Sequence, residues 1–353
     1  MSIKMKKVLM IVLCASLIMM LTACGNEQKQ PVNADVSPVV QQLYADFDAA
    51  LVQQIGAMPE NYGEVKVGAV IISLTNPFWA NMKNCYEEAA ANLGVTLDVQ
   101  TGTTEGDTAS QLDVLMTMAD MNYDVIIVSP IDGTNLIPGI KKCNEKGIKV
   151  INLGPGVDLG ALEQAGGHLD AKITVKFEDQ GEVVIKDMMK RMPDGGKVAV
   201  LAGLAGAAQS EGRTKGAVDA LNTNDKFMLT NVVNCDWDAT KAYDATKDLL
   251  VTHPDLKGIF ACNDVMALAA VEALKAENIN DVYVYGVDFT EEARASIKEG
   301  GMTGSMSYSS AKYTAAALQM AIMLKEGQEI TSPVFLPLTL ANPENINDLD
   351  GWK

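Results

Sequence analysis

The chain has 353 residues, with 45 acidic against 28 basic side chains and a net charge of −17 at pH 7. A surface this acidic repels phosphate backbones, which argues against nucleic acid as a partner. The length is sufficient for two globular domains of ordinary size.

The first 24 residues have the features of a bacterial secretion signal with a lipobox. Three lysines precede an apolar run over residues 8–20, which is shorter than the roughly 20 residues that a membrane-spanning helix needs. Leu21-Thr22-Ala23 then precedes Cys24. We expect removal of residues 1–23 and lipidation of Cys24, so that the lipid is the only attachment to a membrane. The alternative is an ordinary signal peptide with a chance cysteine.

Residues 24–63 are predicted to form a tether followed by a helix. The segment from Gly25 to Pro38 is polar and contains two prolines, as a flexible tether does. Apolar side chains then recur at helical spacing, namely Val40, Leu43, Phe47, Leu51 and Ile55. This spacing predicts an amphipathic helix over 38–56 that packs against the main body.

From Glu64 onward, apolar β-branched runs alternate with helical stretches. Strands are predicted at 65–72, 96–100, 125–128, 149–153, 197–201, 229–234, 258–261 and 282–287. Helices are predicted at 78–93, 107–121, 134–147, 178–192, 212–223, 239–252, 264–277 and 289–299. This alternation, with strands rich in Val and Ile, predicts parallel sheets covered by helices on both faces.

The strand–helix pattern occurs twice, over residues 65–153 and again over 197–287. We therefore predict an α/β fold of two doubly wound parallel-sheet domains. Ligands of open α/β sheets bind outside the carboxyl ends of the strands. Two such domains facing each other would form a cleft lined by those ends.

The turn after the first predicted strand carries Asn76, Phe78 and Trp79. The amide of Asn76 can bridge two hydroxyl groups, and the two aromatic rings offer flat apolar faces. A sugar needs both, because its C–H faces are apolar and its rim carries donors and acceptors. The alternative is that Asn76 caps a helix ahead of two core aromatic residues.

A glycine-rich turn ending in Arg213 follows the first strand of the second half. Gly206 to Gly212 is one residue too long for a Walker motif, and Arg213 stands where that motif has lysine. Arg213 is predicted to donate to ligand oxygens, with a surface salt bridge as the alternative.

Later strand ends of the second half carry an aromatic ring, an amide and a carboxylate. These are Trp237, Asn263 and Asp288, and the last two can each take two adjacent hydroxyl groups. Asp264 is expected to cap the helix that follows it.

Cys85, Cys143, Cys235 and Cys262 lie far apart and form no metal-binding spacing with the two histidines, His168 and His253. We expect buried free thiols rather than disulfides, and neither a metal nor a cofactor. Catalysis is not expected, because neither histidine falls at a predicted cleft position.

These motifs resemble those of the ribose- and galactose-binding branch of the type I periplasmic binding proteins, over about residues 64–342. The resemblance is carried by Asn76-Pro77-Phe78-Trp79, by Gly206 to Arg213, by Asn263-Asp264 before a Met-Ala-Leu helix, and by Gly286-Val287-Asp288. It implies that ligand is contacted by Asn76, Phe78, Trp79, Arg213, Trp237, Asn263 and Asp288. It also places a polar hinge position of the family at Tyr308.

Two positions depart from the family pattern. Gly154-Pro155 stands where pentose binders of the family have an Asp-Arg pair, and Tyr308 replaces a glutamine-like residue. These changes argue against ribose as the ligand. A larger sugar, a deoxy or modified sugar, or a polyol remains possible. Ser129 and Glu178 are the candidates to compensate.

The resemblance further implies three crossings between the domains. One domain would comprise 64–178 and 309–336, the other 179–308 and 337–353, with a hinge that closes on ligand. The implied function is that of an extracytoplasmic lipoprotein of the bacterial cell membrane that delivers a sugar or polyol to the permease of an ABC importer. The alternative is a ligand-sensing subunit that acts on a membrane sensor.

Overall fold

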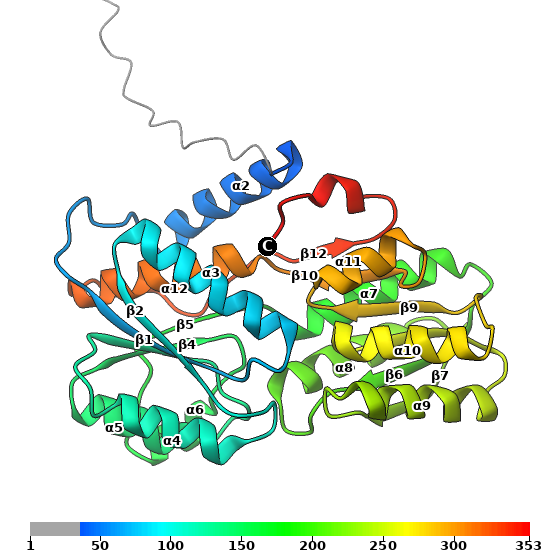
Figure 1. Cartoon of the computed structure of the whole chain (residues 1–353), viewed down its shortest axis with the longest axis horizontal. Helices are drawn as coiled ribbons and strands as arrows, with labels where there is room; N and C mark the ends of the chain where they lie inside the picture. The colour runs from blue at the N-terminus through cyan, green and yellow to red at the C-terminus, as the bar shows by residue number, and fades with distance from the viewer. Residues whose placement is uncertain (1–35) are drawn as a thin grey trace, which may run out of the picture. The chain divides into compact units, whose positions relative to one another are not determined.

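The computed structural model describes residues 36–353 (Figure 1). The predicted signal over 1–23, the lipidation site Cys24 and the first part of the tether lie outside the described residues. Among the helices that the structure describes, none is long and apolar enough to cross a membrane.

Two six-stranded sheets form the scaffold, and they repeat one strand order. The first sheet runs β11-β5-β4-β3-β1-β2 and the second β12-β10-β9-β8-β6-β7. The strands of the first sheet are β1 (Lys66–Ile71), β2 (Thr96–Thr101), β3 (Val125–Val128), β4 (Lys149–Leu153), β5 (Ala171–Thr174) and β11 (Val334–Phe335). The strands of the second are β6 (Gly196–Ala202), β7 (Phe227–Asn234), β8 (Leu256–Ala261), β9 (Tyr283–Val287), β10 (Gly304–Ser307) and β12 (Thr339–Ala341). The predicted pair of doubly wound α/β domains is confirmed, with β12 as an antiparallel edge strand.

Helices cover both faces of each sheet (Figure 1). Those associated with the first sheet are α3 (Pro77–Leu93), α4 (Thr108–Met118), α5 (Ile137–Glu145), α6 (Leu159–Gln164) and α12 (Ser310–Lys325). Those associated with the second are α7 (Phe177–Arg191), α8 (Ala208–Leu221), α9 (Ala239–Thr252), α10 (Asp264–Ala276) and α11 (Glu291–Lys298). A short 3-10 helix, η1 (Ile346–Leu349), lies near the C-terminus.

Alternate side chains of the first sheet enter separate cores. Val67, Ala69 and Ile71 of β1 pack in the core that contains α3 and α12. Val70 of the same strand packs on the other side, in the core with α4 and α5. Both faces are therefore buried, as the Val- and Ile-rich strands predict.

The predicted N-terminal helix is present as α2 (Pro38–Ile55). The Ser37 hydroxyl accepts a hydrogen bond from the backbone N–H of Val40 and so caps the helix. Phe47 and Leu51 are buried in the core that contains α3 and α12. Apolar burial on one face therefore attaches α2 to the main body.

The chain passes three times from elements of one sheet to elements of the other. The passages run from β5 to α7, from β10 to α12 and from β11 to β12. Several of these elements escape the sequence pattern. In α12, 11 of 16 residues are buried, so the helix shows no amphipathic period, and β10 is the fully buried but polar Gly-Ser-Met-Ser.

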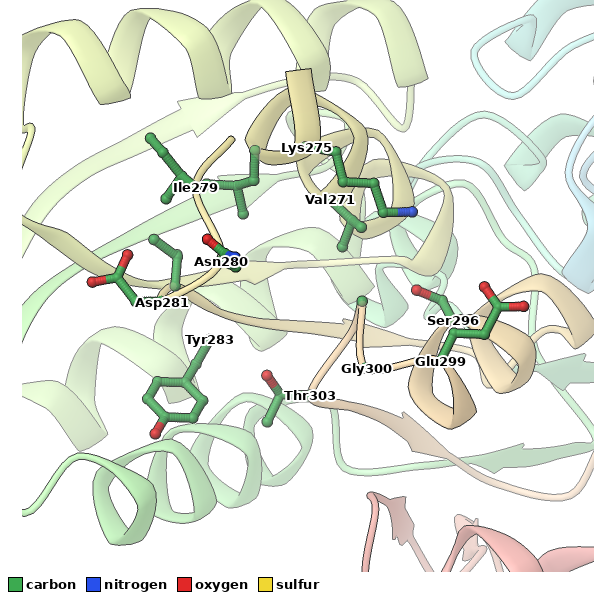
Figure 2. A pocket seen from close by; sticks show the side chains of 13 residues that line it. Val271, Lys275, Ile279, Asn280, Asp281, Tyr283, Ser296, Glu299, Gly300 and Thr303 are labelled. Carbon is green, nitrogen blue, oxygen red and sulfur yellow. The ribbon is translucent and has the colours of Figure 1, made fainter. Parts of the chain in front are cut away.

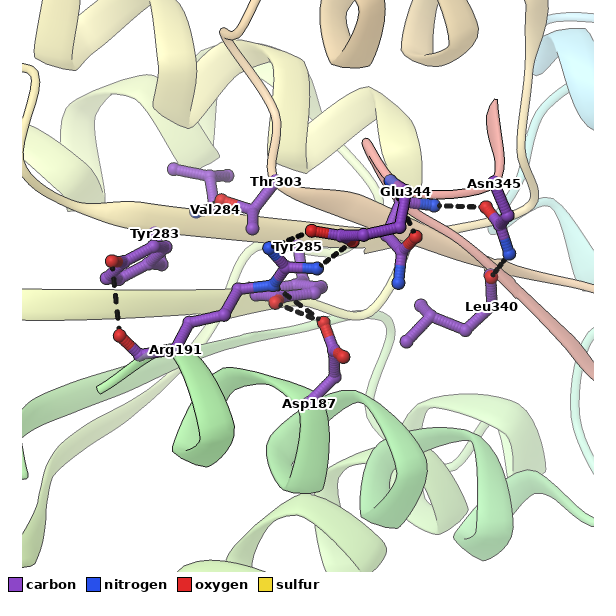
Figure 3. A network of polar contacts seen from close by, with 10 residues as sticks. Asp187, Arg191, Tyr283, Val284, Tyr285, Thr303, Leu340, Glu344 and Asn345 are labelled. Carbon is purple, nitrogen blue, oxygen red and sulfur yellow. Dashed lines mark hydrogen bonds and ion pairs between the residues drawn. The ribbon is translucent and has the colours of Figure 1, made fainter. Parts of the chain in front are cut away.

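A polar network connects α7, β9 and the segment after β12 (Figure 3). Arg191 donates through Nε to Asp187 at 2.9 Å and through its two terminal nitrogens to the carboxylate of Glu344. The Tyr285 hydroxyl donates to the same Asp187 at 2.7 Å. These bonds fix the strand whose end carries Asp288.

Candidate functional site

A cavity with about 360 Å³ of space, part of it open to solvent, lies where strand ends of the two sheets meet. Every residue that lines it follows the carboxyl end of a strand, as expected for open α/β sheets. Eight of its lining residues are those that the family motifs single out: Asn76, Phe78, Trp79, Arg213, Trp237, Asn263, Asp288 and Tyr308. Four more complete the wall: Glu105, Pro155, Phe177 and Gln209.

Asn76 caps the helix that follows it and also lines the cavity. Its Oδ1 accepts the backbone N–H of Phe78 at 2.9 Å and so caps α3. Its side chain also bonds Glu105 in the cavity wall. The cap therefore fixes the direction of the amide toward the site.

An aromatic cluster forms one wall of the cavity. The ring of Phe78 packs edge-on against Trp79 at 5.0 Å and against Tyr308 at 5.8 Å between ring centroids. Tyr308 in turn packs edge-on against Tyr313 at 5.3 Å. All four rings are buried, so the wall is held by apolar packing.

Glu105 is the carboxylate on the first-sheet side. It follows β2 and is only partly exposed, and its Oε1 is buried without a hydrogen-bond partner. Burial raises the pKa of Glu105 to about 7, the negative charge of Asp288 adds to the rise, and the bond from Asn76 opposes it.

Arg213 owes its position to close packing of α7 on α8. A Cβ on Gly181 would lie 2.0 Å from the Arg213 carbonyl oxygen. A Cβ on Gly216 would lie 1.9 Å from the Glu178 carbonyl oxygen. Only glycine allows this approach. It brings Arg213 Nε within 2.7 Å of Gln180 Oε1.

Two further contacts hold the Arg213 guanidinium. One terminal nitrogen donates to the Cys262 carbonyl at 2.7 Å, and the other lies 3.8 Å from Asp288 Oδ1. Arg213 is 4% exposed. The alternative of a surface salt bridge is therefore wrong, because the ion pair is buried inside the site.

Asp288 is held at the end of β9 in a strained conformation. Its φ is +115°, a region that residues with a Cβ rarely adopt, and its N–H donates to the Met306 carbonyl at 2.8 Å. Burial raises the pKa of Asp288 to about 7, although the neighbouring Arg213 opposes the rise. The strain turns a charged side chain inward at a strand end.

Trp237 lies over the end of β6 because residue 203 is glycine. A Cβ at Gly203 would lie 2.1 Å from the indole ring. The Trp237 backbone has a φ of +65°, also in the left-handed region. The indole ring therefore occupies space that a side chain at position 203 would fill.

Asn263, and not Asp264, caps α10. Asn263 Oδ1 accepts the Met266 N–H at 2.9 Å, while its Nδ2 is buried without a partner. Asp264 instead accepts from Ser305 Oγ at 2.7 Å and from the Thr290 N–H at 2.8 Å. The expected capping role of Asp264 is wrong, because its carboxylate joins β10 to the turn that follows β9.

Ser129 and Glu178 do not line the cavity. The Ser129 side chain is buried at the end of β3, and its hydroxyl has no partner. Glu178 is 58% exposed and pairs with Lys215. Neither residue is therefore placed to compensate for the Asp-Arg pair that this chain lacks at positions 154–155.

Glu105 and Gln209 are lining residues that sequence reasoning missed. Glu105 follows the second strand of its half, so a search of every strand end would have found it. Gln209 lies in the first turn of α8, four residues before Arg213, in a segment that the sequence predicts as a glycine-rich turn. Its Oε1 is buried without a partner, which no sequence pattern reveals.

A larger hollow lies near the amino ends of β9 and β10 (Figure 2). It has about 1180 Å³ of space, much of it open to solvent, and Lys275, Asp281 and Glu299 are among its lining residues. This is the edge of the sheet opposite to the strand ends where ligands of this fold class bind. It contains none of the predicted site residues.

The cysteines within residues 36–353 are all free and buried, as expected: Cys85, Cys143, Cys235 and Cys262. Burial raises the pKa of the Cys85, Cys143 and Cys235 thiols to about 11. In the same part of the chain no group of three or more His, Cys, Asp or Glu side chains could hold a metal ion.

Residues 67–329 match the family model described as the periplasmic binding protein domain. The chain belongs to this family. The match covers β2 to β10, nearly all of β1 and the strand ends that form the cavity, so the resemblance inferred from the motifs is confirmed.

Named relatives are similar over most of their length. The D-allose-binding periplasmic protein of Escherichia coli is 32% identical over 265 residues, which covers 74% of this chain and 85% of the relative. The ribose import binding protein RbsB of Bacillus subtilis is 26% identical over 339 residues, which covers 95% of this chain and 99% of the relative.

A solved structure shares the fold. The ABC transporter periplasmic solute-binding protein of Actinobacillus succinogenes, with bound D-allose, has a TM-score of 0.77 and 27% identity. The match covers 81% of this chain and 100% of that protein.

Proposed function

We propose that this protein is an extracytoplasmic solute-binding protein that captures a sugar or polyol between its two sheets and delivers it to an ABC importer. One observation carries the proposal. The cavity has aromatic faces and three buried polar atoms without a protein partner, namely Glu105 Oε1, Gln209 Oε1 and Asn263 Nδ2. Buried polar atoms are normally paired, so a hydrogen-bonding ligand is expected there.

The chemistry of the wall favours a polyhydroxylated ligand. Phe78, Trp79 and Trp237 can cover the apolar C–H faces of a sugar ring. Carboxylates and amides from both sheets can bond hydroxyl groups around the rim. The D-allose and ribose named in the relatives, and the D-allose bound in the solved neighbour, support this ligand class.

Binding without catalysis fits the same wall. The two lining carboxylates, Glu105 and Asp288, can bond the hydroxyl groups of a ligand, and the family whose model matches the chain is described as one of binding proteins. The proposal therefore assigns ligand contacts to the eight motif residues and to Glu105 and Gln209, and no reaction.

Closure of a hinge would present the loaded form to the permease. The proposed lobes are 64–178 with 309–336, and 179–308 with 337–353. The three chain passages between the sheets support a hinge at their boundaries. The cavity is formed by both sides, so ligand contacts would stabilise the closed form.

Intrinsic fluorescence tests the ligand class directly. The chain has three tryptophans, and Trp79 and Trp237 line the cavity while Trp352 does not. A bound sugar or polyol should change the emission of the full-length protein in a saturable way, and Trp352→Phe should keep that change. Saturable changes with nucleosides or amino acids, but with no sugar or polyol, would overturn the proposal.

The lipid anchor at Cys24 is the second part of the proposal. Cys24→Ser should release the protein from washed membranes without altering ligand affinity. Retention of the variant on the membrane would show that another segment holds it there.

A further inference from the structure

The cavity wall holds buried polar atoms that no protein group satisfies. Glu105 Oε1 and Gln209 Oε1 are unpaired acceptors, and Asn263 Nδ2 is the unpaired donor that accompanies them. Gln209 and Asn263 are 8% and 2% exposed, so water has little access to them. A hydroxyl group both donates and accepts, whereas an ammonium group only donates. The wall thus suits a ligand that donates to the two oxygens and accepts from the amide nitrogen.

The buried charges are also unbalanced. Glu105 and Asp288 line the cavity with Arg213 as the cation among the lining residues. Arg213 is already engaged by Gln180, the Cys262 carbonyl and Asp288. Asp264, whose pKa is raised in part by the charge of Asp288, takes its hydrogen bonds from neutral donors. Glu105 is therefore left without a cationic partner.

An uncompensated buried carboxylate is costly, and a charge on the ligand removes that cost. The rise in the pKa of Glu105 to about 7 has burial as its largest cause, which agrees with this account. Bonds from neutral hydroxyl groups would stabilise the carboxylate less than an ammonium group, because charge-assisted bonds are about twice as strong.

The groove beside the cavity has the same sign of charge. It shares Asn76, Glu105 and Trp237 with the cavity and is open to solvent. Asp236 and Asp238 add two carboxylates there, and Lys241 is paired with Asp236 at 2.7 Å. A groove with net negative charge attracts cations and repels anions.

We propose that the ligand is a polyol carrying one ammonium group, such as an amino sugar, and that Glu105 is the residue that selects it. This rests on the proposed function and narrows its ligand class. The ammonium group lies against Glu105 Oε1, and the hydroxyl groups bond Asp288, Asn263 and Gln209. The aromatic wall covers the ring.

The test compares amino sugars with their neutral parents on the full-length chain in detergent. Calorimetric titration is made with D-glucose and D-glucosamine, D-galactose and D-galactosamine, D-mannose and D-mannosamine, and myo-inositol and its monoamino derivative. The pH is kept below the pKa of the amines. In the pair with the correct stereochemistry, the amino member should bind about tenfold tighter or more, as expected for a charge-assisted bond.

Glu105→Gln then removes the charge and keeps the shape. The preference for the amino member should fall to about twofold or less, because the amino member loses a charge-assisted bond and therefore more affinity than the neutral member. Glu145→Gln is the matched control, because Glu145 is an exposed glutamate of α5 that pairs with Lys141. It should leave the preference unchanged.

The outcomes separate this inference from the function on which it rests. A neutral polyol that binds as tightly as its amino partner overturns the amino-ligand inference alone, as does an unchanged preference in Glu105→Gln. Binding of neither member of any pair counts against the polyol class itself. The comparison of paired ligands on the unmodified protein remains decisive even where Glu105→Gln folds poorly.

Discussion

The two sheets share one strand order but place different chemistry at their strand ends. The first sheet contributes Phe78 and Trp79, with Glu105 as its carboxylate. The second contributes Arg213 and Asp288, together with Asn263, Gln209 and Trp237. Both sides therefore contribute aromatic rings, and the second-sheet side is the polar side, because it holds the arginine and most of the hydrogen-bonding groups.

The two sides also differ in how they are held. On the second-sheet side, Arg213 is fixed by Gln180 and the Cys262 carbonyl, and Asp288 is held by backbone strain and a strand hydrogen bond. On the first-sheet side, edge-on aromatic packing orders Phe78 and Trp79, and the bond from Asn76 orders Glu105. Polar groups fixed before binding lose little entropy when ligand arrives. Substitutions on the polar side should therefore have the larger effects.

Loss of Arg213 should have the largest effect. Arg213→Met leaves Asp288 and Gln180 buried without their partner, and removing one member of a buried ion pair costs about 3–5 kcal/mol. Urea unfolding of the ligand-free protein measures this loss. Lys215→Met, on the exposed face of the same helix, should change the free energy of unfolding by less than about 0.5 kcal/mol.

Equal losses for the two variants would show that the Arg213 contacts do not contribute to stability. The contrast between the polar second-sheet side and the first-sheet side would then have no energetic basis.

Asp288→Ala should weaken ligand binding about ten- to a hundredfold, or roughly 1.5–3 kcal/mol, as expected for a lost charged hydrogen bond. The measurement is calorimetric titration with the ligand that binds the unmodified protein. Asp219→Ala, a change to an exposed aspartate of α8, is the control and should bind normally. Normal binding by Asp288→Ala would remove Asp288 from the site.

Gly203→Ala tests the shape of the cavity. The new methyl group would overlap the Trp237 ring, so unfolding should become easier by about 1–3 kcal/mol. Gly63→Ala is the control, because a Cβ there meets nothing within 4 Å. A variant as stable as the control would mean that Trp237 can leave its position freely.

The smallest effect concerns pH. The pKa of Glu105 in the folded protein is about 7, above its ordinary value of 4.5, so the folded state holds more protons between these values. The contribution of Glu105 to the stability of the ligand-free protein should therefore be fully present below about pH 4.5 and be lost as pH rises through about 7. Asp288, which faces Glu105 together with Arg213 and Tyr308, acts in the same direction.

Thermal melting across this pH range measures how steeply the melting temperature falls as pH rises. Glu105→Gln should make this fall shallower. A slope that is unchanged in the variant would assign the effect to Asp288 or to groups outside the cavity.

Strong periodic patterns made much of the fold predictable. The repeated strand–helix units predict both sheets, and glycine and capping residues place the turns where the site lies. The pattern fails for α12, which is apolar on all sides, and for β10, whose Ser-rich sequence has no β-branched residue. Tertiary burial decides the structure of both elements, and a local pattern does not contain it.

The site residues were predictable where the sequence matches a motif of a known family. Glu105 was missed because it lies in a turn with no motif. The role of Asp264 was mistaken because a capping pattern fits Asn263 equally well. The partners that decide these roles, such as Ser305 and Thr290, are distant in sequence and meet only in the fold.

The most direct test of the central claim is the thermal stability of the full-length protein in detergent across sugars, polyols, amino sugars, nucleosides and amino acids. A ligand at 100 times its dissociation constant should stabilise the fold by about 2.7 kcal/mol. The account predicts a rise in melting temperature with one group of sugars, polyols or their amino derivatives. A rise with nucleosides or amino acids alone, or with no compound of the panel, would contradict it.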